Sequence, residues 1–134
     1  MIHADKNILL LEYSEICMST YTDELTDVGY RVHGFYDPDK ALRFCSRPDF
    51  SLDCFVVNTN VRGNSIVSGY DFINRLGDRK YSRYSRCPII FLSVLFDESL
   101  IDPERIEETK IYLLEIPFLP QKFITTLNEI LGDN

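Results

Sequence analysis

The chain has 134 residues, a length typical of one domain, and it is 45% hydrophobic and 26% charged, as soluble folded proteins are. Fourteen Lys and Arg and 21 Asp and Glu give a formal net charge of −7, which disfavours electrostatic binding to nucleic acid or to an anionic membrane. No apolar run approaches the ~18 residues of a membrane span, and residues 1–6 lack the layout of a signal peptide. The four cysteines form no C-x-x-C pair. We therefore expect one soluble cytoplasmic domain over residues 1–134 with reduced cysteines.

Five short apolar runs are predicted to be strands. They cover residues 7–11, 30–35, 53–58, 88–92 and 111–114. The first, third and fourth are apolar at consecutive positions, which is typical of strands buried on both faces of a parallel sheet. The second alternates between apolar and polar residues, as an edge strand does.

The polar segments between these runs are predicted to be helices. Ser14 is the N-cap of the first, and Gly29 ends it. An aspartate N-cap followed by a first-turn proline opens two others, at 37–38 and 102–103. The remaining two helices begin at Gly69 and Pro120, and the segment 77–86 between helix and strand is expected to be irregular.

Strands that alternate with helices indicate parallel β-α-β units with right-handed crossovers. Five such units predict a three-layer α/β/α sandwich around a five-stranded parallel sheet. Ligands of open parallel sheets bind outside the carboxyl ends of the strands. The positions of interest are therefore 12–15, 58–60, 93–94 and 115–117.

Four segments, in their order and spacing, resemble those of CheY-like response-regulator receiver domains. They are GYRV at 29–32 followed by AL at 41–42, DCFVVN at 53–58, PIIFLS at 88–93, and PF at 117–118 followed by the apolar stripe of the last helix. The resemblance covers nearly the whole chain. It implies a flavodoxin-like sheet with strand order 2-1-3-4-5 and a role in two-component signal transduction through a phosphorelay.

The same resemblance identifies the positions of a phosphorylation site, and most of them carry other residues here. The two acids that hold Mg²⁺ in receivers correspond to Glu12 and Tyr13. The phosphoacceptor aspartate corresponds to Asn58, whose neutral amide cannot form an acyl phosphate. The lysine corresponds to Ile116, and only the hydroxyl position is kept, as Ser93. We therefore predict a degenerate receiver with no catalytic residue, no metal and no cofactor.

The sequence leaves the arrangement within this site open. Asn58 could bond to Ser93 or Glu12 and lock the site, or it could satisfy nearby backbone groups as an ordinary strand-end amide does. Glu12, as a lone acid at a strand end, is expected to be solvated. Relative to the family, the loop after the third strand is lengthened at 64–66.

The leading hypothesis is a stand-alone pseudo-receiver, not an enzyme, that binds a protein partner in a signalling pathway independently of phosphorylation. By resemblance, its interaction face comprises the fourth helix, the fifth strand and the fifth helix, and a homodimer could use the same face. The candidate residues of this face are Ile106, Lys110, Tyr112 and Lys122.

Two alternatives stay open. A displaced acid, Glu12 or Asp53, could still accept a phosphoryl group. The segment 75–86 carries five Lys and Arg, one Asp and two interleaved tyrosines, a pattern that can bind nucleic acid, although a solvated basic loop is the simpler interpretation. The sequence does not determine whether the bond between Ile116 and Pro117 is cis or trans.

Overall fold

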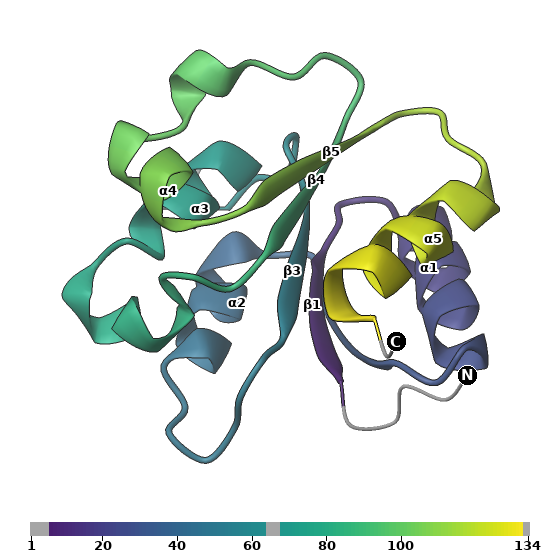
Figure 1. The fold of residues 1–134 in the computed structure, drawn as a ribbon, viewed down its shortest axis with the longest axis horizontal. Helices are drawn as coiled ribbons and strands as arrows, with labels where there is room; N and C mark the ends of the chain where they lie inside the picture. The colour runs from purple at the N-terminus through teal and green to yellow at the C-terminus, as the bar shows by residue number, and fades with distance from the viewer. Residues whose placement is uncertain (1–5, 64–67, 133–134) are drawn as a thin grey trace.

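The computed structural model describes residues 6–63 and 68–132, which form a parallel sheet with helices on both faces (Figure 1). The strands are β1 (Asn7–Leu11), β2 (Arg31–Phe35), β3 (Cys54–Asn58), β4 (Ile89–Ser93) and β5 (Ile111–Glu115). Their order across the sheet is β2-β1-β3-β4-β5, and all neighbouring pairs are parallel. The predicted fold class and strand order are confirmed.

The helices divide between the two faces of the sheet. The α-helices are α1 (Glu15–Asp27), α2 (Pro38–Cys45), α3 (Gly69–Arg75), α4 (Pro103–Glu108) and α5 (Pro120–Leu131), and the 3₁₀ helices are η1 (Arg79–Tyr84) and η2 (Glu98–Leu100). Helices α1 and α5 pack side by side on one face, and α2, α3 and α4 lie on the other side (Figure 1). Among the described residues, no helix has the length and apolar character needed to cross a membrane.

Local signals explain where most helices begin and end. The Ser14 side chain accepts a backbone hydrogen bond from the first turn of α1 at 3.2 Å, and Asp37 accepts one from the first turn of α2 at 2.9 Å, as predicted. Gly29, with φ of 100°, takes the left-handed conformation that ends α1. Asp102 is the N-cap residue of α4 and Pro103 opens its first turn, as predicted, although the Asp102 side chain makes no capping bond.

The central strands β1, β3 and β4 are buried on both faces, as their continuous apolar sequences predicted. One face packs against α2, α3 and η1, and it includes Leu9, Leu11, Phe55, Val57 and Phe91. The other face packs against α1 and α5, and it includes Ile8, Leu10, Val56, Ile90 and Leu92. Because all neighbouring strands are parallel, their carboxyl ends lie at one edge of the sheet.

The basic segment after α3 is more ordered than its sequence predicted. It forms η1, and the side chains of Tyr81 and Tyr84 are buried in the core. The Tyr84 hydroxyl donates a hydrogen bond to the carbonyl of Phe50 at 3.3 Å, and the guanidinium of Arg83 lies 4.7 Å above the Tyr84 ring. Because both rings are inside the protein, they cannot stack on nucleic acid bases. The hypothesis that the two tyrosines of this segment stack on nucleic acid bases is therefore wrong.

Gly69 is needed where α3 approaches β3. A Cβ at this position would lie 2.3 Å from the carbonyl oxygen of Asn58 and 2.7 Å from Cγ1 of Val57. Because backbone must move to make room, we expect Gly69→Ala to lower the free energy of unfolding by about 1–3 kcal/mol in chemical denaturation. The control is Gly34→Ala, whose Cβ would meet only the flexible end of Met18 and should cost less than about 1 kcal/mol. Equal losses would contradict the close approach at Gly69.

His33 lies among aromatic side chains on the edge strand β2. Its ring centroid is 5.3 Å from that of Phe44 and 4.6 Å from that of Phe50, and its Nε2 lies 3.1 Å from Oδ1 of Asn7. Burial lowers the pKa of His33, and the charges of two nearby arginines lower it further.

Because the pKa of His33 is lowered, we predict that acidification lowers the stability of the protein already at pH values above those at which Asp and Glu titrate. The unfolded chain binds a proton at this histidine more readily than the folded protein does. The contribution of His33 to the free energy of unfolding is therefore complete above the ordinary histidine pKa of about 6.5, and it falls as the pH drops below that value. We expect the free energy of unfolding to fall between pH 7.5 and pH 5.5 and His33→Gln to flatten that slope, as urea titrations at several pH values can measure. An unchanged slope in the variant would contradict this assignment.

Candidate functional site

The carboxyl ends of β1, β3 and β4 bring four polar side chains together inside the protein. Glu12, Asn58 and Ser93 lie at this edge, as the sequence predicted, and they form two hydrogen-bonded pairs, Asn58 with Glu12 and Thr59 with Ser93. All four side chains are buried. Buried polar groups require partners, so the hydrogen bonds among these residues determine what the site can do.

Glu12 and Asn58 are bonded to each other. The Asn58 Nδ2 donates to Oε1 of Glu12 at 3.0 Å, and the backbone N–H of Ser14 donates to Oε2 at 2.9 Å. The Asn58 Oδ1 also accepts from the backbone N–H of Asn60 at 2.8 Å. Asn58 therefore fills both roles that the sequence left open. The expectation that Glu12 is solvated is wrong, because two donors hold its carboxyl group inside the protein.

A second hydrogen bond engages the hydroxyl of Ser93. The Thr59 Oγ1 donates to the Ser93 Oγ at 3.0 Å, and the Ser93 carbonyl accepts from the backbone N–H of Ile116 at 2.8 Å. Thr59 falls within the positions 58–60 predicted from the strand ends, but no role was predicted for its side chain. The two bonds tie the ends of β3, β4 and β5 to one another.

The two positions where the sequence lacks an expected charge differ in their surroundings. Tyr13 is exposed and borders a surface hollow of about 570 Å³, whose other lining residues are Tyr36, Asn60 and Arg62. Ile116 is half-buried against the apolar cluster beneath α1 and α5, and the peptide bond between Ile116 and Pro117 is cis. Neither side chain brings a charge to Glu12 and Asn58.

Asp53, the alternative phosphoryl acceptor, lies at the opposite end of β3. Its Oδ2 accepts a hydrogen bond from the backbone N–H of Asn7 at 2.7 Å, at the amino edge of the sheet. Asn58 ends the five-residue strand β3, whose first residue follows Asp53, so the two positions lie about 16 Å apart. The hypothesis that Asp53 serves this site is therefore wrong. The lengthened loop at 64–66 lies outside the described residues.

No cluster of metal-ligating side chains accompanies the site. Within residues 6–63 and 68–132, no three His, Cys, Asp or Glu side chains gather closely enough to hold a metal ion. The four cysteines are free thiols, and burial raises the pKa of both Cys45 and Cys87 to about 12.

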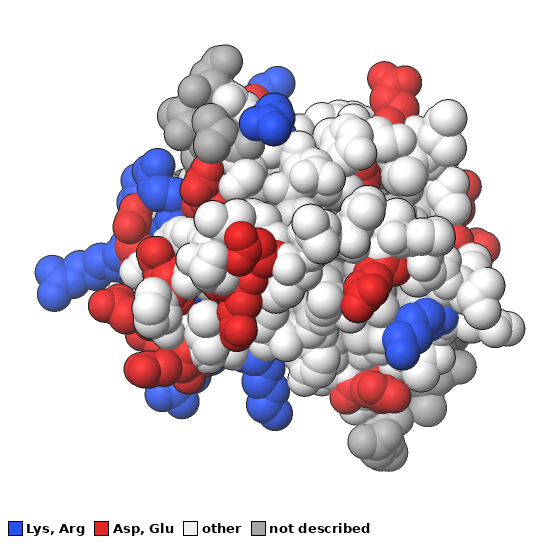
Figure 2. Space-filling view, turned by 90° about the horizontal axis from the view of Figure 1, so that it is seen from above, with Lys and Arg blue, Asp and Glu red and all other residues white. Residues whose placement is uncertain are grey.

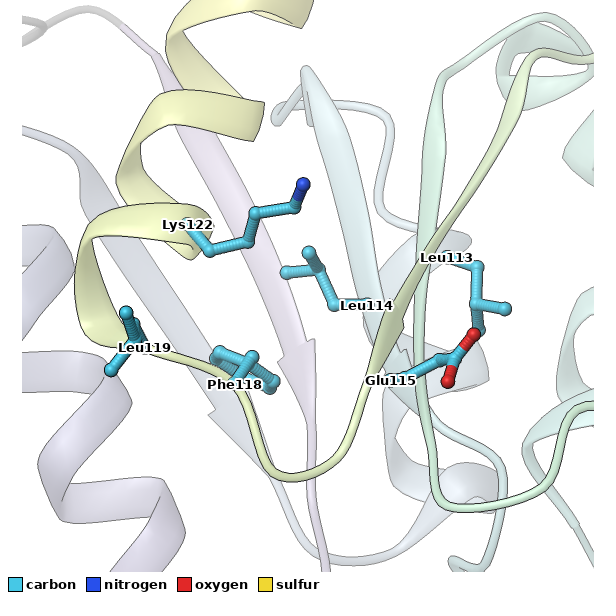
Figure 3. Close-up of a pocket in the computed structure, with 6 residues that line it drawn as sticks. All are labelled: Leu113, Leu114, Glu115, Phe118, Leu119 and Lys122. Carbon is cyan, nitrogen blue, oxygen red and sulfur yellow. The ribbon is translucent and has the colours of Figure 1, made fainter.

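The predicted interaction face contains two grooves, one on each side of the edge strand β5. The first, of about 420 Å³, is lined by Leu113, Leu114, Glu115, Phe118, Leu119 and Lys122 (Figure 3). The second, of about 380 Å³, lies toward α4 and includes Ile106 and Tyr112 among its lining residues. Lys110 is exposed but lines neither groove. Three of the four predicted face residues therefore border a groove.

Arg105 anchors α4 to neighbouring segments. Its side chain is only 1% exposed, and Nε donates to the carbonyl of Ile73 at 3.2 Å. The Nη1 donates to the carbonyl of Ser85 at 3.4 Å and lies 3.5 Å from the Glu108 carboxylate. Burial lowers the pKa of Arg105. This guanidinium joins α4 to the end of α3 and to the segment after η1.

Comparisons with known proteins bear on the fold. No protein-family model and no curated protein matches the sequence. The structure is similar to chemotaxis protein CheY4 of Vibrio cholerae, with a TM-score of 0.75 and 22% identity over 93% of this chain and 98% of that one.

Two other receiver domains are similarly close in structure. The receiver domain of a Pseudomonas aeruginosa sensor histidine kinase, solved with a magnesium ion in its active site cleft, has a TM-score of 0.71 and 20% identity over 96% of this chain and 98% of that one. The signal receiver domain of an HD-domain protein from Pseudomonas fluorescens has a TM-score of 0.74 and 22% identity over 94% of each chain. The chain therefore has the CheY-like receiver fold.

Proposed function

We propose that this protein is a degenerate receiver that acts in signal transduction as a protein-interaction module, without phosphorylation and without catalysis. The observation that carries the proposal is the pairing of its buried polar groups. Asn58 is bonded to Glu12, and Thr59 is bonded to Ser93, so the groups at the usual site of phosphorylation satisfy one another.

The chemistry of the site supports the absence of phosphoryl transfer. An amide at position 58 is no nucleophile for an acyl phosphate, and Mg²⁺ prefers several hard oxygen ligands where this site offers one carboxyl group. If a phosphoryl group drew the Ser93 hydroxyl away from Thr59, the buried Thr59 hydroxyl would lose this partner, and an unpaired buried group costs about 1–3 kcal/mol. The site is therefore built to hold one arrangement.

The grooves beside β5 support protein binding as the output. In Figure 3, Leu114 and Phe118 lie between β5 and α5 and Lys122 extends from α5, whereas Leu113 and Glu115 point to the other side of β5. An edge strand flanked by apolar grooves offers both side-chain pockets and free backbone groups to a partner or to a second copy.

Phosphoryl transfer is tested by intact mass after incubation with a small phosphodonor and Mg²⁺. We expect no phosphoryl adduct on the wild-type chain, whereas a genuine receiver domain treated alongside should gain one. An adduct on the wild-type chain would overturn the proposal in favour of a residual phosphoacceptor. Its loss in Glu12→Gln would then identify the displaced acid.

The interaction face is tested separately with co-expressed signalling proteins and by analytical ultracentrifugation. A partner or a dimer that uses this face should be lost in Ile106→Asp and in Lys122→Glu, while Arg79→Glu, on the exposed surface of η1, should leave it unchanged. A strictly monomeric chain that retains no partner would contradict the proposal.

A further inference from the structure

A small pocket lies between α1 and the segment that leads from β5 into α5, and we call it the α1 pocket. It has a volume of about 200 Å³, and it is lined by Thr20, Tyr21 and Glu24 of α1, by residues 116–118 and by Pro120. In Figure 1 this segment crosses from β5 to α5, which lies beside α1. Of the described residues that line the α1 pocket, only Phe118 also lines a groove beside β5.

The aromatic part of the lining is held by ring contacts. The ring centroids of Tyr21 and Phe118 lie 5.7 Å apart, with an angle of 21° between the ring planes. The ring of Phe123, which is fully buried, meets both of them edge-on, at 5.4 Å from Tyr21 and 5.7 Å from Phe118. Aromatic rings present apolar surface to alkyl groups and attract cations that lie within about 6 Å of the ring centre.

The carboxyl group of Glu24 gives the α1 pocket its polar character. Its Oε2 is buried, and no donor among the described residues bonds to it. Burial raises the pKa of Glu24, because an uncompensated charge is costly away from water. Most buried polar groups in proteins have a hydrogen-bond partner. A cation in the pocket would compensate the charge of the whole carboxyl group, whichever oxygen it contacts.

The charges of the surrounding elements also favour a cation. Helix α1 contains four acids and no Lys or Arg, α5 contains Lys122 and Glu129, and residues 116–119 are uncharged. The Lys122 side chain extends from α5 toward β5 in Figure 3, away from α1. On the right-hand side of Figure 2, which is the side of α1 and α5 in Figure 1, acidic side chains predominate.

We infer that the α1 pocket binds a primary alkylammonium group, that of a free amine or of a lysine side chain. The carboxyl group of Glu24 and the hydroxyl of Thr20 would accept hydrogen bonds from the ammonium, and its methylene groups would lie against Tyr21 and Phe118. The inference depends neither on the loss of phosphorylation nor on the grooves beside β5.

The probe is n-butylammonium, which is fully charged at pH 7 because alkylamines titrate near pH 10. It is titrated into the isotope-labelled protein at constant ionic strength and followed by amide NMR. n-Butanol is the neutral control of similar size. N-acetyl-lysine methylamide presents the same ammonium group on a peptide backbone and therefore distinguishes a protein side chain from a free amine.

The test variant is Glu24→Gln, which removes the charge and keeps the shape of the side chain. The matched control is Asp23→Asn, the same chemical change at an exposed neighbouring position of α1. Leu113→Ser, in the grooves beside β5, is the control for the other surface. Because burial disfavours the charged carboxyl group, Glu24→Gln should melt at or above the wild-type temperature.

We expect n-butylammonium to cause saturable shifts at residues 20–24 and 116–120, and n-butanol to bind at least about tenfold more weakly. Glu24→Gln should lose about tenfold or more in affinity for the amine, and Asp23→Asn and Leu113→Ser less than about twofold. The bound amine should raise the melting temperature of the wild type and not that of Glu24→Gln. Equal binding of the capped lysine would assign the pocket to a protein side chain, and its failure to bind would assign the pocket to a free amine.

Four results would overturn the inference. The first is the absence of saturable shifts at residues 20–24 and 116–120. The second is equal binding of n-butanol, which would show an apolar pocket without selectivity for charge. The third is an equal loss in Glu24→Gln and Asp23→Asn, which would show a diffuse attraction to the acids of α1. The fourth is a lower melting temperature of Glu24→Gln, which would show that the carboxyl group already has a partner within the protein.

Discussion

Asn58→Asp is expected to destabilise the protein at neutral pH and to leave it nearly unchanged in acid. The substitution replaces the amide that donates to Glu12 at 3.0 Å with a second carboxyl group in a buried site. Burial and the neighbouring acid raise the pKa of the introduced group above its unfolded value near 4. The variant therefore has nearly the wild-type free energy of unfolding below about pH 4. That free energy falls as the pH rises, and at pH 8 it is lower than the wild-type value by about 2–4 kcal/mol.

The control for this prediction is Asn60→Asp, which makes the same chemical change two residues away on an exposed side chain. It should alter the free energy of unfolding by less than about 0.5 kcal/mol at either pH. Mg²⁺ should restore part of the stability of Asn58→Asp, because two carboxyl groups now face each other, and should leave the wild type unchanged. Wild-type stability of Asn58→Asp at pH 8 in EDTA would contradict the pairing of Asn58 with Glu12.

Arg105→Ala is expected to cost about 3–5 kcal/mol in urea denaturation. The variant removes the guanidinium donor from the carbonyl groups of Ile73 and Ser85, which keep their bonds from Leu76 and Thr109, and it opens a cavity between α4 and α3. Arg105→Met fills most of that volume without a buried charge and should recover at least half of the loss. Lys110→Ala, which removes an exposed cation near the same helix, should cost less than about 0.5 kcal/mol.

A loss in Arg105→Ala no greater than that in Lys110→Ala would show that the guanidinium is solvated. A loss in Arg105→Met equal to that in Arg105→Ala would show that the hydrogen bonds, and not the volume, hold α4 in place. Either result is read from the same set of urea titrations.

The strands could be predicted from the sequence because their signal is local. The five predicted runs differ from the observed strands by one residue at most at either end. Continuous apolar residues indicate burial on both faces without knowledge of the partner strand. The capping signals at Ser14 and Asp37 are equally local, and both were correct.

The contacts that define the candidate site could be predicted only in part. The resemblance placed Glu12, Asn58 and Ser93 at one edge, but the buried Glu12 carboxyl group is held by the nearby Ser14 N–H and by the Asn58 amide, which lies 46 residues away in the chain. The bond from Thr59 to Ser93 joins residues 34 positions apart, and the hydrophobic periodicity of the sequence cannot predict such a side-chain contact. The buried Arg105 lies in an acidic stretch that looks like a solvated face in sequence.

The measurement that most directly tests the central claim is a titration with Mg²⁺ and beryllofluoride, a mimic of a bound phosphoryl group, followed by amide NMR. The paired hydrogen bonds of Glu12 with Asn58 and of Thr59 with Ser93 predict no saturable shifts at Asn58, Ser93 or Tyr112. Saturable shifts at these amides would show a working metal and anion site, and the account of a receiver without a phosphorylation switch would be wrong.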